Sequence, residues 1–220
     1  MGYHAAGLTN LVFYAIALLG TAHQLRVIWR RRAAPSAGET PTALISLNQL
    51  AVSFLGYYAF FVYGYCVEPF NHYLVWPRLA GVLLVLAILF ELARDRREPR
   101  SLGVFAAGAL ALLPAVGVLV AQPTIDATAR RVPQTLAVVA TALLVQGFVH
   151  QILLVRRARR VGAVSLRMHV ATFVKDFSLA GLGFAMGLAA GWPLILMGGA
   201  SVAVKGVLIA HLLRYRTRGG

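Results

Sequence analysis

Three ionisable side chains stand inside long apolar stretches of this sequence. Lys175 and Asp176 interrupt the apolar run at 168–188, and Lys205 interrupts the run at 192–213. If these runs cross a bilayer, each central Lys or Asp costs about 2.5 to 3.5 kcal/mol to insert. Side chains that cost so much are rarely left facing lipid, and in membrane proteins they mark the pathways of ions and solutes.

The positions of Asp176 and Lys205 favour an ion pair between them. Asp176 follows the start of its run by ~8 residues and Lys205 precedes the end of the next run by ~8, so at 1.5 Å per residue both lie ~12 Å deep. Two interpretations remain open. The pair neutralises itself inside a helix bundle, or Asp176 serves a gate or a proton-coupling site on a solute pathway.

Other polar residues could line a cavity. Arg78 lies about one helical turn inside its run, where it either extends to the membrane surface or faces a cavity and meets an anionic group. Farther along the same helix, Glu91 is expected to be neutralised by Arg94 or Arg97. The candidate residues for the lining of a solute cavity are Asn48, Tyr57, Arg78 and Ser201.

The dipeptide His-Gln occurs twice at the end of an apolar run. His23 and Gln24 end the first run, and His150 and Gln151 end the fifth; arginines follow in both places. The recurrence predicts two related units with these residues at equivalent positions. We expect both histidines to turn inward at one depth, and the four side chains to form a gate.

The elements that must hold these residues are membrane-spanning helices. With 59% hydrophobic residues, 13% charged residues and a mean hydropathy of +0.73, the chain is too apolar for a water-soluble domain. About 20 residues at 1.5 Å each match a hydrocarbon core about 30 Å thick. Seven runs fit this length, at roughly 7–28, 43–65, 73–92, 102–121, 132–155, 168–188 and 192–213.

The net charge of +14 is distributed by side of the membrane. Most basic residues follow the first, third, fifth and seventh runs, and loops rich in Lys and Arg stay in the cytoplasm. We therefore expect a multi-pass protein of the cell membrane, with its N-terminus outside and its C-terminus in the cytoplasm. The same distribution argues against nucleic acid as a partner, and leaves the lipid bilayer and a small-molecule solute.

The fourth run, at 102–121, lies between two sets of three. We interpret it as a linker helix that lets two parallel three-helix repeats share one orientation. The predicted fold is an all-α membrane protein with seven transmembrane helices in a 3+1+3 arrangement. The predicted divisions are 1–98 for the first repeat, 99–131 for the linker helix with its flanking loops, and 132–220 for the second repeat.

This arrangement resembles the SWEET and PQ-loop (MtN3-like) superfamily of transporters. The resemblance rests on the 3+1+3 order, on the Gln near the end of the first helix of each repeat, on the step at 162–166, and on Met186-Gly187 closing the sixth run. It implies alternating-access transport of a small polar solute, such as a sugar, an amino acid or another small metabolite. Acidic residues couple protons in lysosomal members, a role that Asp176 would take here.

Two departures from the family pattern bear on mechanism and substrate. His23 and His150 replace the proline of the Pro-Gln pair, which is thought to act as a hinge. Arg78 replaces the sugar-contacting asparagine of the third helix, and only Gly198 and Ser201 lie near the corresponding position of the seventh. A solute with an anionic group would suit Arg78 better than a neutral sugar.

Two other classes of protein fit part of the pattern. A retinal-binding photoreceptor would use Lys205 for a Schiff base, but the acid of the third helix, Glu91, lies too near the cytoplasmic end to serve as its counter-ion. A receptor or assembly subunit that transports nothing could use the same fold, as the KDEL receptor does. The histidines lack metal-ligand spacing, so we expect no metal, no cofactor and no enzymatic activity. The oligomeric state stays open, a homo-oligomer included.

Overall fold

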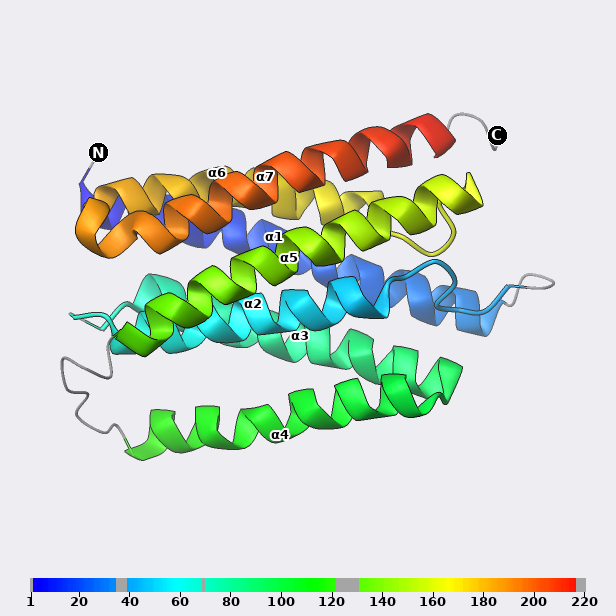
Figure 1. Cartoon of the computed structure of the whole chain (residues 1–220), viewed down its shortest axis with the longest axis horizontal. Helices are drawn as coiled ribbons and strands as arrows, with labels where there is room; N and C mark the ends of the chain where they lie inside the picture. Colours follow the sequence, from blue (N-terminus) through cyan, green and yellow to red (C-terminus); the bar gives the residue numbers. More distant parts are fainter. Residues whose placement is uncertain (1, 35–38, 69, 122–130, 217–220) are drawn as a thin grey trace.

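The computed structural model describes residues 2–34, 39–68, 70–121 and 131–216. Over these ranges the chain forms seven α-helices and no strand, and the helices run side by side along the long axis of the molecule (Figure 1). They are α1 (Tyr3–Ala33), α2 (Leu47–Cys66), α3 (His72–Arg96), α4 (Pro99–Ala121), α5 (Arg131–Ala158), α6 (Leu166–Ala185) and α7 (Leu188–Arg216). The predicted all-α, seven-helix membrane fold is confirmed.

Five of the described helices are by themselves long and apolar enough to cross a membrane, namely α1, α3, α4, α5 and α7. The other two, α2 and α6, have 20 residues each and carry many of the polar side chains of the interior. Their lower hydropathy follows from that content. The chain is a multi-pass membrane protein.

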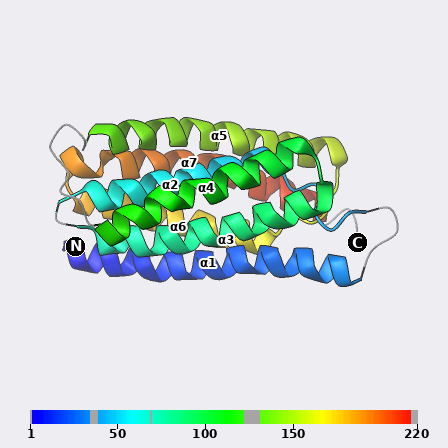
Figure 2. The ribbon, with the colours of Figure 1, turned by 90° about the horizontal axis from the view of Figure 1, so that it is seen from below.

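The six helices other than α4 pack in a pattern that repeats itself. Within the first trio, α3 packs between α1 and α2; within the second, α7 packs between α5 and α6. Across the trios, α1 packs on α6 and α5 packs on α2, and Figure 2 shows α1 and α5 at opposite edges of the bundle. Exchanging α1, α2 and α3 for α5, α6 and α7 turns each of these contacts into another one. The pattern supports two three-helix repeats, each ordered first, third, second.

Helix α4 stands apart from this pattern. In the described part of the chain it packs on α3 and α2 alone, and it lies at one edge of the bundle in Figure 1, opposite α6 and α7. Its outer face consists of large exposed apolar side chains, among them Leu110 and Leu113, as a lipid-facing surface requires. This position suits a linker between the trios, and the divisions at 98 and 131 stay a prediction.

A second internal repeat lies in the third helix of each trio. Trp76-Pro77 and Trp192-Pro193 each place the proline five residues after the first residue of its helix, His72 in α3 and Leu188 in α7. Each proline lies inside its helix, past the first turn, and removes the backbone bond to the carbonyl four residues earlier. In α3 the Tyr73 carbonyl freed in this way accepts from the Arg78 guanidinium. The dipeptide aligns α3 with α7 residue by residue.

The second helix of each trio begins at an equivalent cap. The Ser46 hydroxyl accepts from the backbone N–H of Gln49, and the Ser165 hydroxyl accepts from that of Met168. Serine is a preferred N-cap because its oxygen satisfies a free N–H of the first turn. Helix α2 therefore begins at Leu47, later than the hydropathy pattern predicts.

The predicted partner of Glu91 is wrong. Glu91 faces α1, where it pairs with Arg32 and accepts a hydrogen bond of 3.0 Å from the Trp29 indole. Arg94 and Arg97, the expected partners, are exposed. The expectation considered neighbours along one helix alone, whereas the contact of α1 with α3 supplies a closer cation.

Candidate functional site

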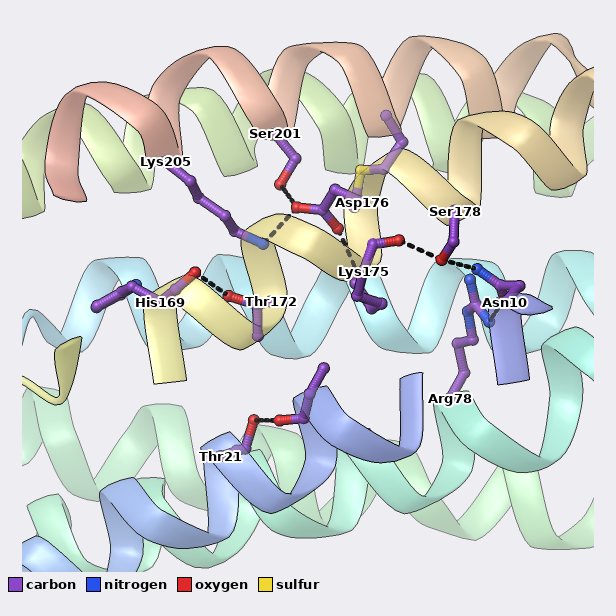
Figure 3. A network of polar contacts seen from close by, with 12 residues as sticks. Asn10, Thr21, Arg78, His169, Thr172, Lys175, Asp176, Ser178, Ser201 and Lys205 are labelled. Carbon is purple, nitrogen blue, oxygen red and sulfur yellow. Dashed lines mark hydrogen bonds and ion pairs between the residues drawn. The ribbon is translucent and has the colours of Figure 1, made fainter. Parts of the chain in front are cut away.

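A buried carboxylate lies where the two trios meet. Asp176 is 1% exposed, and its Oδ2 accepts from Lys205 Nζ at 2.6 Å and from the Ser201 hydroxyl at 2.5 Å. Its Oδ1 lies 2.7 Å from Nζ of Lys175. Figure 3 shows Asp176 between these partners. The ion pair with Lys205 is the contact that their equal depths in the sequence suggested, and Lys175 joins it as a second cation.

The close approach of α6 and α7 sets this geometry. Ser201 and Lys205 are one turn apart on α7, so they share a face. One turn earlier on that face, a side chain at Gly198 would put its Cβ 2.8 Å from the backbone oxygen of Asp176. The absence of a side chain there lets α7 lie against α6 at the carboxylate.

Arg78 lies at one end of the polar row in Figure 3, opposite His169. The side chain is 2% exposed, and its Nη1 donates to the Asn10 side-chain oxygen at 3.4 Å and to the Tyr73 carbonyl at 3.3 Å. Its guanidinium carbon lies 4.5 Å from the centroid of the Tyr14 ring. Arg78 thus faces the bundle interior and does not extend to the membrane surface.

Hydrogen bonds connect Arg78 to the carboxylate cluster. The Asn10 amide donates to the Ser178 hydroxyl at 3.1 Å, and this hydroxyl donates to the backbone carbonyl of Lys175 at 2.7 Å. Nζ of Lys175 lies 5.0 Å from the centroid of the same Tyr14 ring that Arg78 covers. Helices α1, α3, α6 and α7 therefore contribute to one buried network.

A small cavity lies beside Lys205, toward the start of α6. It offers about 30 Å³ to the centres of water molecules, which is space for about two of them. Tyr57 lines this cavity, and Nζ of Lys175 lies 5.7 Å from its ring centroid. The other polar residues of the lining are Thr21, Gln49, Ser53, His169 and Thr172.

Two buried polar atoms near this network have no hydrogen-bond partner among the described residues. They are Nδ1 of His169, which lines the cavity, and the hydroxyl of Tyr14. Both side chains are 1% exposed. A buried polar atom without a partner is costly, so each is a position where water or a ligand would be favoured.

At the end of the bundle where α6 begins, Gln24 of α1 holds the start of that helix. Its amide donates to the Ala163 carbonyl at 2.8 Å, and its side-chain oxygen accepts from the backbone N–H of Ser165 at 2.7 Å. The Gln24 side chain is fully enclosed, so that water cannot replace these bonds.

Gln151 of α5 makes the same two bonds to the start of α2. It donates to the Leu44 carbonyl at 3.0 Å and accepts from the backbone N–H of Ser46 at 2.8 Å. We call these four bonds from Gln24 and Gln151 the glutamine clamp. Through it, each repeat fixes the second helix of the other.

The two histidines also occupy equivalent positions. His23 Nδ1 lies 3.0 Å from the Ser165 hydroxyl, and His150 Nδ1 lies 2.8 Å from the Ser46 hydroxyl. These are the N-cap serines of α6 and α2. His23 is half-buried but His150 is exposed, so the prediction that both turn inward is wrong for His150.

An acidic residue outside the membrane-spanning segments adds to the same end. Glu39 precedes α2 and pairs with Arg31, at the end of α1, and with Arg160, after α5. The hydrogen bond from Arg31 holds the pKa of Glu39 below its usual value. The carboxylate connects the end of α1 with the segment that follows α5.

Asn48 does not reach the central cluster, contrary to prediction. Its amide donates to Gln146 at 2.8 Å, and it lines a surface cleft of about 290 Å³ with Arg96, Arg100 and His150. Consecutive helical residues point about 100° apart. Gln49 takes the inward direction, and Asn48 is turned away from it.

Asn10, Tyr14 and His169 belong to this site but were not predicted from the sequence. None of them belongs to a recurring motif, and Asn10 and Tyr14 lie in a helix with no clear polar stripe. Their spacing could have indicated them, since Asn10, Tyr14, Thr21 and Gln24, with Ala17 between Tyr14 and Thr21, recur every three to four residues on the buried side of α1.

No protein-family model matches this sequence, and no curated protein matches it. Among solved structures, the fold is similar to that of a eukaryotic SWEET transporter, described at 3.7 Å resolution. The TM-score is 0.63 at 17% sequence identity, and the similarity covers 98% of this chain and 97% of that chain. The chain has a SWEET-like fold, as its helix order and repeated glutamines suggested.

Proposed function

We propose that this protein is a membrane transporter that moves a small polar solute between its two three-helix repeats by alternating access. The observation that carries the proposal is the enclosed charged network at the interface of the repeats, centred on Asp176. Charges inside a membrane are costly to bury and mark solute pathways. The SWEET-like fold supports the same function, since the similar structure is that of a transporter.

Contacts between the repeats lie on both sides of the network. The glutamine clamp joins them at one end. At the other, the Tyr63 hydroxyl of α2 donates to the Ala190 carbonyl of α7, and Asn71, before α3, contacts the Met186 sulfur at 3.7 Å. We infer that the solute enters when one set of contacts opens while the other holds.

Asp176 is the candidate for proton coupling in this scheme. It is the carboxylate of the network, and both of its oxygens are held by cations. Transport coupled to protons would need this group to exchange its lysine partners for a proton. In the proposed orientation the N-terminus is outside the cell, and the glutamine clamp is the cytoplasmic gate.

The purified protein in proteoliposomes tests the function. We expect saturable exchange of at least one solute from a panel of labelled sugars, amino acids and organic acids, with a large loss in the variant Lys205→Met. Arg94→Gln, which changes an exposed arginine at the end of α3, is the matched control and should transport normally. Equal rates in empty liposomes and in proteoliposomes for the whole panel would contradict the proposal.

One observation favours the photoreceptor alternative, and another argues against it. Asp176 lies at 2.6 Å from Lys205 and would serve as the counter-ion that the third helix lacks. The space beside Lys205 holds about two waters, far less than a retinal polyene needs. We expect no absorbance in the visible range after incubation with retinal.

A further inference from the structure

The charges of the buried network do not balance. It contains three cations, Arg78, Lys175 and Lys205, and one carboxylate, Asp176, and each of the four is at most 5% exposed. Among the described residues, positive charge therefore exceeds negative charge by two. Uncompensated charge is expensive in a low-dielectric interior, and a bound anion would lower that cost.

Arg78 is the cation with the weakest partners. Both hydrogen bonds that it makes within the described part of the chain come from Nη1, go to neutral oxygens and are long, at 3.3 and 3.4 Å. A guanidinium prefers a carboxylate, which accepts two parallel bonds from it. In contrast, both lysines already contact Asp176, so Arg78 is the cation that can bind another carboxylate.

The surroundings of Arg78 offer a further donor. Tyr14 lies under both Arg78 and Lys175, and its enclosed hydroxyl has no partner among the described residues. This hydroxyl also lies 3.0 Å from the point where a side chain at Gly81 would place its Cβ. A hydroxyl beside two cations is well placed to donate to an anionic oxygen.

The other side of the network offers a second place for negative charge. Lys205 and His169 line the cavity together, and Nδ1 of His169 has no partner within the described ranges. Asp176 lies between this end and the Arg78 end. An anion with two charged groups would match the excess of two charges.

We propose that the transported solute is a small organic anion, a mono- or dicarboxylate, with a carboxylate bound between Arg78, Lys175 and the Tyr14 hydroxyl. The inference rests on the proposed transport function and adds the chemical class of the solute. Asp176 is then an internal carboxylate that partly neutralises the site while it is empty. The cavity beside Lys205 holds about two waters and is not lined by Arg78, Lys175 or Tyr14, so the anion binds when the repeats separate.

The test compares three labelled probes in the same proteoliposomes: succinate, a dianion; alanine, a zwitterion without net charge; and glucose, which has no charged group. We expect exchange of succinate and little exchange of the other two. Arg78→Gln should lower kcat/KM for succinate about tenfold or more, because a hydrogen-bonded charge is replaced by a neutral amide. Arg94→Gln should leave it unchanged.

The variant Asp176→Asn distinguishes an anion site from a purely structural role of Asp176. It raises the excess of positive charge from two to three, so KM for succinate should fall several-fold, and succinate should raise the Tm of this variant more than that of the wild type. An increase of KM in a folded Asp176→Asn protein would overturn the proposal. The Arg78→Gln comparison remains available if Asp176→Asn does not fold.

The outcomes separate the class of solute from the function itself. Exchange of alanine or glucose without succinate would overturn the anion and leave the transporter. Exchange of none of the three, with no shift of Tm by succinate, would overturn the anion, and the full panel of sugars, amino acids and organic acids then decides the transport function. Succinate exchange that is insensitive to Arg78→Gln would overturn the assigned site.

Discussion

At the scale of single residues, Asp176 has to satisfy two cations at once. Each of its oxygens lies within 2.7 Å of a lysine Nζ, and Ser201 fills a further lone pair. A fully bonded carboxylate of this kind is held firmly. Removing either its charge or its partners therefore changes the whole network, and the direction of the change depends on which charge is removed.

Asp176→Asn should lower the free energy of unfolding by about 3 to 5 kcal/mol, since it leaves two buried ammonium groups without a carboxylate. Adding Lys205→Met removes one of them, so part of the loss should return, and Lys175 explains why recovery is incomplete. Thermal unfolding in detergent of the single and double variants measures this coupling.

The same double variant also tests proton coupling. If Asp176 carries a proton, the folded double variant should lose the pH dependence of transport, because the titratable group is gone. Transport with the pH profile of the wild type would rule that role out and leave Asp176 and Lys205 as a structural pair.

The sequence could predict this pair but not the full site. Depth within two adjacent runs was sufficient to match Asp176 with Lys205. Lys175 was recognised as costly but not as a partner, since consecutive helical residues point in different directions and the flexibility of a lysine stem is not visible in a pattern. The placement of Arg78 against Asn10 and Tyr14 depends on the contact of α1 with α3, which no local pattern contains.

At the scale of elements, the glutamine clamp predicts effects that cross from one repeat to the other. Gln151→Ala should speed amide hydrogen exchange at the start of α2, and Gln24→Ala should do so at the start of α6. Each loses two enclosed hydrogen bonds, at a cost of about 1 to 3 kcal/mol for each backbone group left unpaired. Hydrogen exchange with mass spectrometry locates the change.

Each variant contains its own control, which is the helix start held by the other glutamine. Gln151→Ala should leave the start of α6 unchanged, and Gln24→Ala should leave the start of α2 unchanged. Faster exchange at the variant's own helix alone would show that the glutamines stabilise their own repeat.

The packing of α6 on α7 depends on a pair of glycines. A side chain at Gly191 would place its Cβ 1.7 Å from the backbone oxygen of Gly183, whereas one at Gly199 meets nothing within 4 Å. Gly191→Ala should therefore lower Tm strongly, by separating the helices. Gly199→Ala, on the same helix, should be neutral or raise stability by about 0.5 to 1 kcal/mol, because alanine restricts the unfolded chain. Similar Tm values for the two variants would contradict the close contact.

At the scale of the whole molecule, the number and order of the helices could be predicted from hydropathy and the repeated His-Gln. The helix ends could not be predicted from hydropathy. Ser46 sets the start of α2 through a side-chain cap, and Gly187, with a positive φ of 81°, sets the turn between α6 and α7. The order first, third, second within each trio was also outside the reach of the sequence. It follows from which faces pack, and the Trp-Pro pairs mark it only once α3 and α7 are compared.

The repeats share their backbone arrangement but not their chemistry. Aligned by their N-cap serines, Asp176 of α6 corresponds to Tyr57 of α2; aligned by Trp-Pro, Lys205 of α7 corresponds to Leu89 of α3. The ion pair is thus confined to the second repeat, and the first contributes Arg78. The symmetric scaffold carries an asymmetric site.

The proposed orientation of the whole chain is open to chemical labelling. In a Cys66→Ser background, a membrane-impermeant maleimide added to intact cells should label Gly2→Cys but not Arg100→Cys, at the start of α4. Permeabilised cells, in which both should react, are the control. Labelling of Arg100→Cys alone in intact cells would reverse the assignment of the two sides.

The excess positive charge of the buried network also affects which inorganic ions can cross the protein. When a transporter opens its pathway, protons, sodium ions and potassium ions can enter that pathway, and the membrane potential acts on all of them. Two unit charges about 4 Å apart interact by about 4 kcal/mol at an effective dielectric constant of 20. A cation that enters beside Arg78, Lys175 and Lys205 therefore meets an electrostatic barrier, so the same charges that would hold the solute keep the membrane from leaking.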